Sequence, residues 1–152
     1  YRRFGYFTSA FAEGWALYSE ILALEAGLAE DPYDELGILQ SELFRAVRLV
    51  VDTGMHFKKW TREEAMEYMK TKTGMSDTEV RVEIERYIVW PGQALSYKVG
   101  MIKILELREK AMSELGDKFN IKDFHSAVLD HGNPPLFIVE EMVNNMIMEN
   151  LN

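Results

Sequence analysis

The longest helical pattern in the sequence is PYDELGILQSELFRAVRLVVDTG, residues 32–54, which opens at a proline and closes at a glycine. Proline suits the first turn of a helix, where its missing N–H is not needed. Apolar side chains then recur at the spacing of one helix face, and they are Leu36, Leu39, Leu43, Ala46, Val47, Val50 and Val51. The pattern predicts one long amphipathic helix.

The flanking segments show the same period, and no run of alternating polar and apolar residues indicates a strand. Capping boxes at Thr61 to Glu64 and Ser76 to Glu79 predict two helix starts. We therefore expect an all-α chain that forms a single helical domain of about seven helices. The other expected helices span Ser9 to Ala29, Gln93 to Leu115 after a break at Trp90-Pro91-Gly92, Asn120 or Lys122 to Asp130, and Pro135 to the end.

Composition limits the possible functions. Of 152 residues, 47% are hydrophobic, which is enough for a buried core. A net charge of −8 disfavours nucleic acid and anionic membrane surfaces as partners, and no apolar run approaches the length of a membrane span. Without cysteine, a bound metal needs His, Asp or Glu ligands. Because the chain starts at Tyr1 without an initiator methionine, we expect a piece of a longer protein.

Four polar residues on the long helix recur at helical spacing beside its apolar run, namely Arg45, Arg48, Asp52 and His56. One interpretation is a solvated face with an ion pair between Arg48 and Asp52. The other is the wall of a polar cavity, in which Asp52 orients His56 or Arg48.

Glu13 and Glu20 lie about two turns apart on the first helix and share a face, which suggests a metal. A di-iron bundle needs Glu-x-x-His pairs, and a self-contained zinc helix needs two histidines four residues apart. Neither spacing occurs around the three histidines, which are His56, His125 and His131. The chain therefore cannot build a full zinc site alone.

Two further segments carry candidate groups. Gln93 and Tyr97 share a face at the start of a helix, where free N–H groups can meet an anionic or carbonyl group of a ligand. A simple helix corner explains the same pattern. His125 is a candidate general acid or oxyanion donor, with a structural histidine as the alternative.

Several segments together resemble a known family. They are FAEGWALYSE at 11–20, RAVRLVVDTGMH at 45–56, the stretch 86–100, and Phe124-His125 through Pro135-Leu136. In this order they are similar to the C-terminal part of the bacterial proteins grouped as domain of unknown function family 885. Members of that family resemble helical zinc metallopeptidases of the gluzincin kind, with a variant His-Glu-x-x-Pro-Gly-His motif upstream.

The resemblance implies that residues 1–152 are the C-terminal helical part of a larger metallopeptidase-like domain. Glu13 is then the third zinc ligand, and the two zinc-binding histidines lie in the missing N-terminal part. Tyr97 and His125 are implied as catalytic groups near the scissile carbonyl. The implied substrate is a peptide, and we expect little zinc binding or activity from this chain alone. Supporting or substrate-binding roles are implied for Arg48, Asp52, His56 and Gln93.

The alternative is a non-catalytic helical scaffold or interaction domain. In that case the C-terminal helix offers an adaptable surface to another helix, made by Met142, Met146, Met148 and Leu151. In either case we expect an exposed apolar surface where the missing part packs, and self-association through it. The peptidase interpretation requires the candidate residues to face one cavity, and the scaffold interpretation does not. These residues are Glu13, Arg48, Asp52, His56, Tyr97 and His125.

Overall fold

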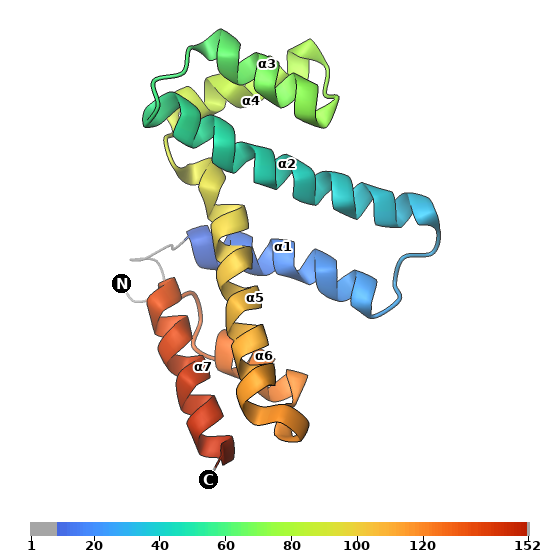
Figure 1. Cartoon of the computed structure of the whole chain (residues 1–152), viewed down its shortest axis with the longest axis vertical. Coiled ribbons are helices and arrows are strands. Elements are labelled where there is room, and N and C mark those ends of the chain that lie inside the picture. Colours follow the sequence, from blue (N-terminus) through green and yellow to red (C-terminus); the bar gives the residue numbers. More distant parts are fainter. Residues whose placement is uncertain (1–8, 152) are drawn as a thin grey trace.

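The computed structural model describes residues 9–151, and over this range it contains seven α-helices, two short 3₁₀ turns and no strand (Figure 1). The predicted all-α class is confirmed. None of the helices in this range is long and apolar enough to cross a bilayer. The elements are α1 (Ser9–Glu25), α2 (Pro32–His56), α3 (Arg62–Thr73), α4 (Asp77–Val89), η1 (Gln93–Leu95), α5 (Ser96–Leu115), η2 (Gly116–Lys118), α6 (Ile121–Leu129) and α7 (Leu136–Leu151).

Local hydrogen bonds fix where several helices begin. The hydroxyls of Thr61 and Ser76 accept hydrogen bonds from the N–H groups of Glu64 and Glu79 at 3.2 and 3.4 Å. The two carboxylates in turn accept from the N-cap N–H groups at 2.7 and 3.0 Å. Both predicted capping boxes are therefore confirmed, and a third one precedes α2 at Asp31.

The first helix is shorter than its apolar pattern suggests. α1 ends at Glu25, although the sequence predicts a helix to Ala29. Gly27 has a φ of 69°, which places it in the left-handed region. The N–H of Leu28 then donates to the carbonyl of Ala23 at 3.0 Å, a bond that closes a helix end.

Apolar side chains gather in two clusters that lie at opposite ends of the molecule in Figure 1. The lower cluster packs α1, α6 and α7 around α5, with Tyr18, Ile104 and Phe124 fully buried. The upper cluster joins α2, α3, α4 and η1, and its buried members are Val47, Val51, Ala65, Met69, Val80, Ile84, Tyr87 and Ala94. The start of α5 connects the two clusters.

α1 and α5 touch backbone to backbone. A Cβ added to Gly100 would lie 1.8 Å from the carbonyl oxygen of Ala10, and one added to Gly14 would lie 2.4 Å from the Cα of Gly100. No side chain fits at either position, so glycine is needed at both. Since Tyr97 is one turn before Gly100 and Glu13 precedes Gly14, the crossing brings these two parts of the chain together.

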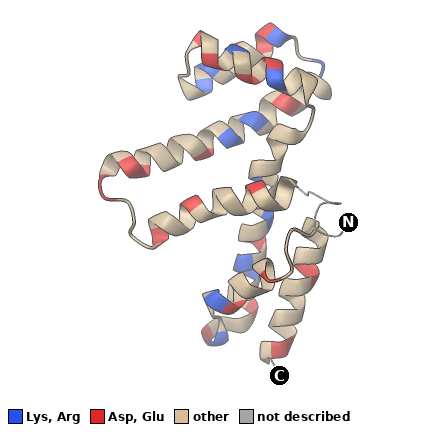
Figure 2. Ribbon diagram, turned by 180° about the vertical axis from the view of Figure 1, so that it is seen from behind, with Lys and Arg blue, Asp and Glu red and all other residues tan. Residues whose placement is uncertain are grey.

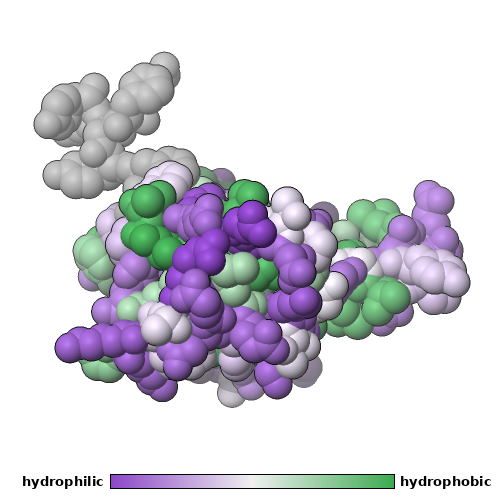
Figure 3. Space-filling view, turned by 90° about the horizontal axis from the view of Figure 1, so that it is seen from above, coloured by the Kyte–Doolittle hydropathy of each residue, from purple (hydrophilic) through white to green (hydrophobic). Residues whose placement is uncertain are grey.

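α1 and α2 run in opposite directions, and the loop that joins them forms the tip of an arm projecting from the body (Figure 1). Large apolar side chains are exposed near this tip, and Figure 3 shows hydrophobic surface on the arm. They include Leu28, Tyr33, Leu36 and Leu39. The expected exposed apolar surface therefore lies here, while self-association through it stays a prediction.

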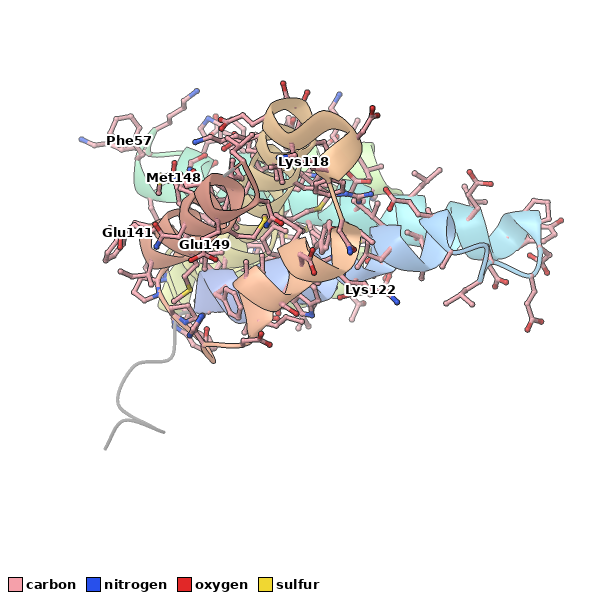
Figure 4. The ribbon with its side chains drawn as sticks, turned by 90° about the horizontal axis from the view of Figure 1, so that it is seen from below. Phe57, Lys118, Lys122, Glu141, Met148 and Glu149 are labelled. Atoms are coloured by element: carbon pink, nitrogen blue, oxygen red, sulfur yellow. The ribbon has the colours of Figure 1, made fainter. Side chains whose placement is uncertain are left out.

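α7 divides its apolar side chains between core and surface. Met146 packs in the lower cluster, whereas Met148 and Leu151 are 56% and 50% exposed, and Met148 points outward from α7 (Figure 4). Met142 lies between these extremes. The four residues expected to form one adaptable surface are therefore not on one exposed face, because the core takes Met146.

Candidate functional site

Two of the four residues in the polar stripe of α2 are buried, and His56 at its end is exposed. Arg48 and Asp52 are 5% and 2% exposed. Arg48 donates from Nη2 to Glu83 at 3.0 Å and from Nε to the hydroxyl of Tyr87 at 2.8 Å. Among the described residues Arg48 and Asp52 do not bond to each other. The interpretation as a solvated face with an Arg48–Asp52 ion pair is therefore wrong.

Glu83 is the centre of this network. Its carboxylate accepts from Arg48, from Arg86 at 2.8 Å and from the hydroxyl of Tyr87. Burial raises the pKa of Glu83, but the hydrogen bonds from Tyr87 and Arg86 and the charge of Arg48 outweigh it and hold the pKa below its usual value. Burial and the neighbouring Glu83 raise the pKa of Tyr87. An ionised carboxylate is thus shared by two arginines.

Asp52 and His56 hold the end of α4. The carboxylate of Asp52 accepts from the N–H of Gly92 at 3.1 and 3.2 Å. Burial raises the pKa of Asp52, while that N–H and the nearby His56 act in the opposite direction. His56 donates from Nε2 to the carbonyl oxygen of Tyr87 at 2.9 Å. One N–H group predicted to meet a ligand, that of Gly92, is therefore already bonded within the chain.

Gln93 and Tyr97 follow this break and contact different arginines. The side-chain oxygen of Gln93 accepts from Arg86 at 3.2 Å. The ring of Tyr97 lies beneath the guanidinium groups of Arg45 and Arg48, whose carbons are 5.2 and 5.0 Å from the ring centre. The structure therefore brings Arg48 and Tyr97 together.

Of the three carboxylates of α1, Glu20 borders α2, and Glu25 pairs with Arg108 of α5. Glu20 lines an open hollow with Gly37, Ile38 and Ser41 of α2. Glu13, seven residues earlier, points within about 20° of the same direction around the helix. α1 and α2 are antiparallel (Figure 1), so helix geometry directs Glu13 toward the side of α1 that Glu20 occupies, nearer the start of α1. In Figure 2 the charged residues on α1 are all acidic, whereas α2 carries both acidic and basic residues.

α1 and α2 carry several polar atoms that have no partner among the described residues. Glu13 is half-buried and makes no hydrogen bond or salt bridge with the described residues. Four buried side-chain polar atoms in the described range lack a hydrogen-bond partner, and three of them are Oε2 of Glu20, Nε of Arg45 and Nη1 of Arg48. Buried polar atoms are normally bonded. These polar atoms of α1 and α2 can therefore take partners that the described residues do not supply.

His125 lies elsewhere. Its Nε2 and the hydroxyl of Tyr18 share a hydrogen bond of 3.0 Å, and its ring packs edge-on against Trp15 at 5.4 Å between centroids. Burial, with help from Arg108, lowers the pKa of His125. Trp15 and Tyr18 point about 200° and 140° away from Glu13 around α1. His125 therefore contacts the opposite flank of α1 and is not brought to Glu13.

Some residues of the network were missed from the sequence. The partners of Arg48 are Glu83, Tyr87 and Phe44. The ring centre of Phe44 lies 4.2 Å from the guanidinium carbon of Arg48. The spacing of four between Glu83 and Tyr87 indicates a contact within one helix. No local pattern in the sequence indicates that Glu83 and Tyr87 bind a side chain of α2.

The described residues do not gather a set of metal ligands. Residues 9–151 contain no group of three or more His, Asp or Glu side chains arranged to hold one. Glu13 fits the role of a single ligand, because its carboxylate has no partner among the described residues. A tetrahedral site built on Glu13 therefore needs ligands from outside this range.

Comparison with known proteins identifies the family. The structure is similar to the crystal structure of a protein from Colwellia psychrerythraea that is provisionally described as a lipoprotein, with a TM-score of 0.91 and 56% identity over 93% of this chain. The chain covers 24% of that protein. No curated protein matches it. Residues 1–143 match the family described as "Bacterial protein of unknown function (DUF885)". The chain therefore belongs to this bacterial family of unknown function.

Proposed function

We propose that the chain is the C-terminal helical part of a zinc-dependent peptidase, in which Glu13 is the third zinc ligand. The observation that carries the proposal is the state of Glu13. This carboxylate is half-buried and has no partner among the described residues. An acid in such a position is typical of a ligand whose metal and other ligands come from elsewhere.

The remaining ligands belong to the longer protein. The family resemblance implies two histidines and a catalytic glutamate in a His-Glu-x-x-Pro-Gly-His segment outside this chain. The similar protein from Colwellia psychrerythraea is about four times as long as the part matched here, so it has room for such a segment. Zinc held in this way supplies a Lewis acid for peptide-bond hydrolysis.

The residues of this chain fix the geometry of that site. Ser9 and Ser96 share a hydrogen bond of 2.7 Å, and Gly14 meets Gly100 one turn further on, so the start of α5 is held against α1. Tyr97 follows Ser96, and its ring is held by the arginines of α2. In the proposed reaction the hydroxyl of Tyr97 donates a hydrogen bond to the carbonyl oxygen of the scissile bond.

The test uses the full-length protein that contains this chain. We expect Glu13→Gln to remove most of the bound zinc and most of the peptidase activity, because a neutral amide is a poor zinc ligand. Tyr97→Phe should keep zinc and slow turnover by about 10²-fold, as for loss of one oxyanion donor. Zinc content is measured by mass spectrometry and activity on a peptide library.

The matched control is Glu109→Gln, on an exposed position of α5. It should retain both zinc and activity. If Glu13→Gln keeps its zinc and its activity, the assignment of Glu13 as a ligand is wrong.

A further inference from the structure

Arg45 is a cation without an acidic partner among the described residues, in a chain of net charge −8. Its Nε is buried and has no hydrogen-bond partner. The guanidinium carbon lies 5.0 Å from the ring centre of Phe44 and 5.2 Å from that of Tyr97. The rings therefore hold the guanidinium in place while its hydrogen-bonding capacity is unused.

Arg48 provides a second, independent observation. It is only 5% exposed, yet its Nη1 has no partner. Its guanidinium carbon lies 4.2 Å from the ring centre of Phe44 and 5.0 Å from that of Tyr97. Arg45 and Arg48 contact the same two rings and are therefore neighbours. Glu83 compensates Arg48 but is shared with Arg86. The three arginines Arg45, Arg48 and Arg86 share only the charge of Glu83, so an excess of positive charge remains that an anion would reduce.

The hollow beside Arg45 adjoins the hollow between α1 and α2. Arg45 lines an open hollow of about 270 Å³ between α2 and the end of α3, which also includes Gly37, Ser41, Thr73 and Met75. Gly37 and Ser41 also line the adjoining hollow, where Glu20 lies. Oε2 of Glu20 and Nε of Arg45 are both without partners, so these two atoms do not bond to each other.

We propose that Arg45 and Arg48 bind a carboxylate, and that in the working protein this is the C-terminal carboxylate of the peptide substrate. A guanidinium matches a carboxylate through two parallel hydrogen bonds, and stacked rings hold its plane for that contact. The proposal rests on the peptidase function proposed above and deepens it. Since the ring of Tyr97, the proposed donor to the scissile carbonyl, contacts both arginines, cleavage takes place near the C-terminal end of the peptide.

A carboxylate has two sources, a peptide terminus or an Asp or Glu side chain of the longer protein. The experiment separates them by measuring ligand binding to the zinc-free full-length protein. The probes are acetyl-Ala-Ala-Ala with a free C-terminal carboxylate and the same peptide with a C-terminal amide, and the dissociation constants are measured by calorimetry.

We expect the acid to bind about 10- to 100-fold more tightly than the amide, as for one charge-assisted pair. In Arg45→Gln this preference should fall to about 2-fold or less. The control Arg81→Gln, on an exposed position of α4, should keep the full preference. Since both probes are compared on the same protein, partial unfolding weakens both and leaves their ratio unchanged.

Equal binding of acid and amide to the wild-type protein overturns the proposal and assigns the arginines to an internal carboxylate. A preference that survives in Arg45→Gln also overturns it. Because no zinc is present, the outcome is independent of Glu13. A peptidase assignment that fails in the Glu13→Gln test is therefore distinguishable from a carboxylate site that fails here.

Discussion

The contact between α1 and α5 makes Gly100→Ala the most informative change to the fold. The added Cβ would lie 1.8 Å from the carbonyl oxygen of Ala10, against the 3.4 Å at which ordinary van der Waals contact begins. The obstacle is backbone, which cannot rotate away as a side chain does. The two helices must therefore separate by roughly 1.6 Å.

This separation opens the lower cluster, in which both helices bury side chains. Overpacking of this kind costs about 1–3 kcal/mol or more, while alanine gains up to about 1 kcal/mol over glycine within a helix. We expect a net loss of about 2 kcal/mol, which lowers Tm by roughly 4–8 °C for a chain of this size. Thermal unfolding of the purified chain, followed by circular dichroism, measures the shift.

The matched control is Gly37→Ala in α2, where no atom lies within 4 Å of the added Cβ. Here only the helix preference of alanine acts, so the free energy of unfolding should rise by about 0.5–1 kcal/mol. If Gly100→Ala is as stable as the wild type, or more stable, α1 and α5 do not cross in backbone contact.

Three other predictions follow from the charges and surfaces. The pKa of Glu83 lies below its usual value in the folded state, so its ionised form stabilises the fold at neutral pH, and this stabilisation is lost as the pH falls through the folded pKa. As the pH falls below roughly 5, the free energy of unfolding from denaturation curves should fall more steeply for the wild type than for Glu83→Gln. An equal fall in the two proteins would contradict this. The isolated chain should bind zinc weakly in calorimetry, because its described residues offer no group of three ligands, and a tight single site lost in Glu13→Ala would contradict it. The exposed apolar arm should cause self-association, and light scattering that finds a monomer at high concentration would refute it.

The sequence was a reliable guide where the signal was local. The capping boxes at Thr61 and Ser76 are predicted correctly because each is complete within four residues. The end of α1 was placed too late, because its apolar pattern continues past Gly27 while the left-handed glycine already ends the helix. Helix type was thus easier to predict than the exact boundary.

The candidate site was harder to predict, because its contacts join residues far apart in the chain. The spacing of Arg48 and Asp52 suggested an ion pair, yet their partners are Glu83 and Gly92. Burial changes the outcome, since each charge needs hydrogen bonds that its helix neighbour does not supply. Likewise, no pattern in the sequence pairs Tyr18 with a histidine that is 107 residues away.

The family resemblance implies one site that includes Glu13, Arg48, Tyr97 and His125, and the structure brings Arg48 and Tyr97 of this set together. His125 was grouped with them because it is a histidine in a matching motif. Its contact with Tyr18 on the other flank of α1 indicates a role in joining α6 to α1.

The central claim is that Glu13 binds zinc in the longer protein. The most direct measurement is X-ray diffraction from crystals of the full-length protein above and below the zinc absorption edge, which locates zinc independently of any activity. We expect one zinc peak in the gap between α1 and α2, about 2.0–2.2 Å from a carboxylate oxygen of Glu13. A zinc peak away from Glu13, or none in protein supplied with zinc, would contradict the account.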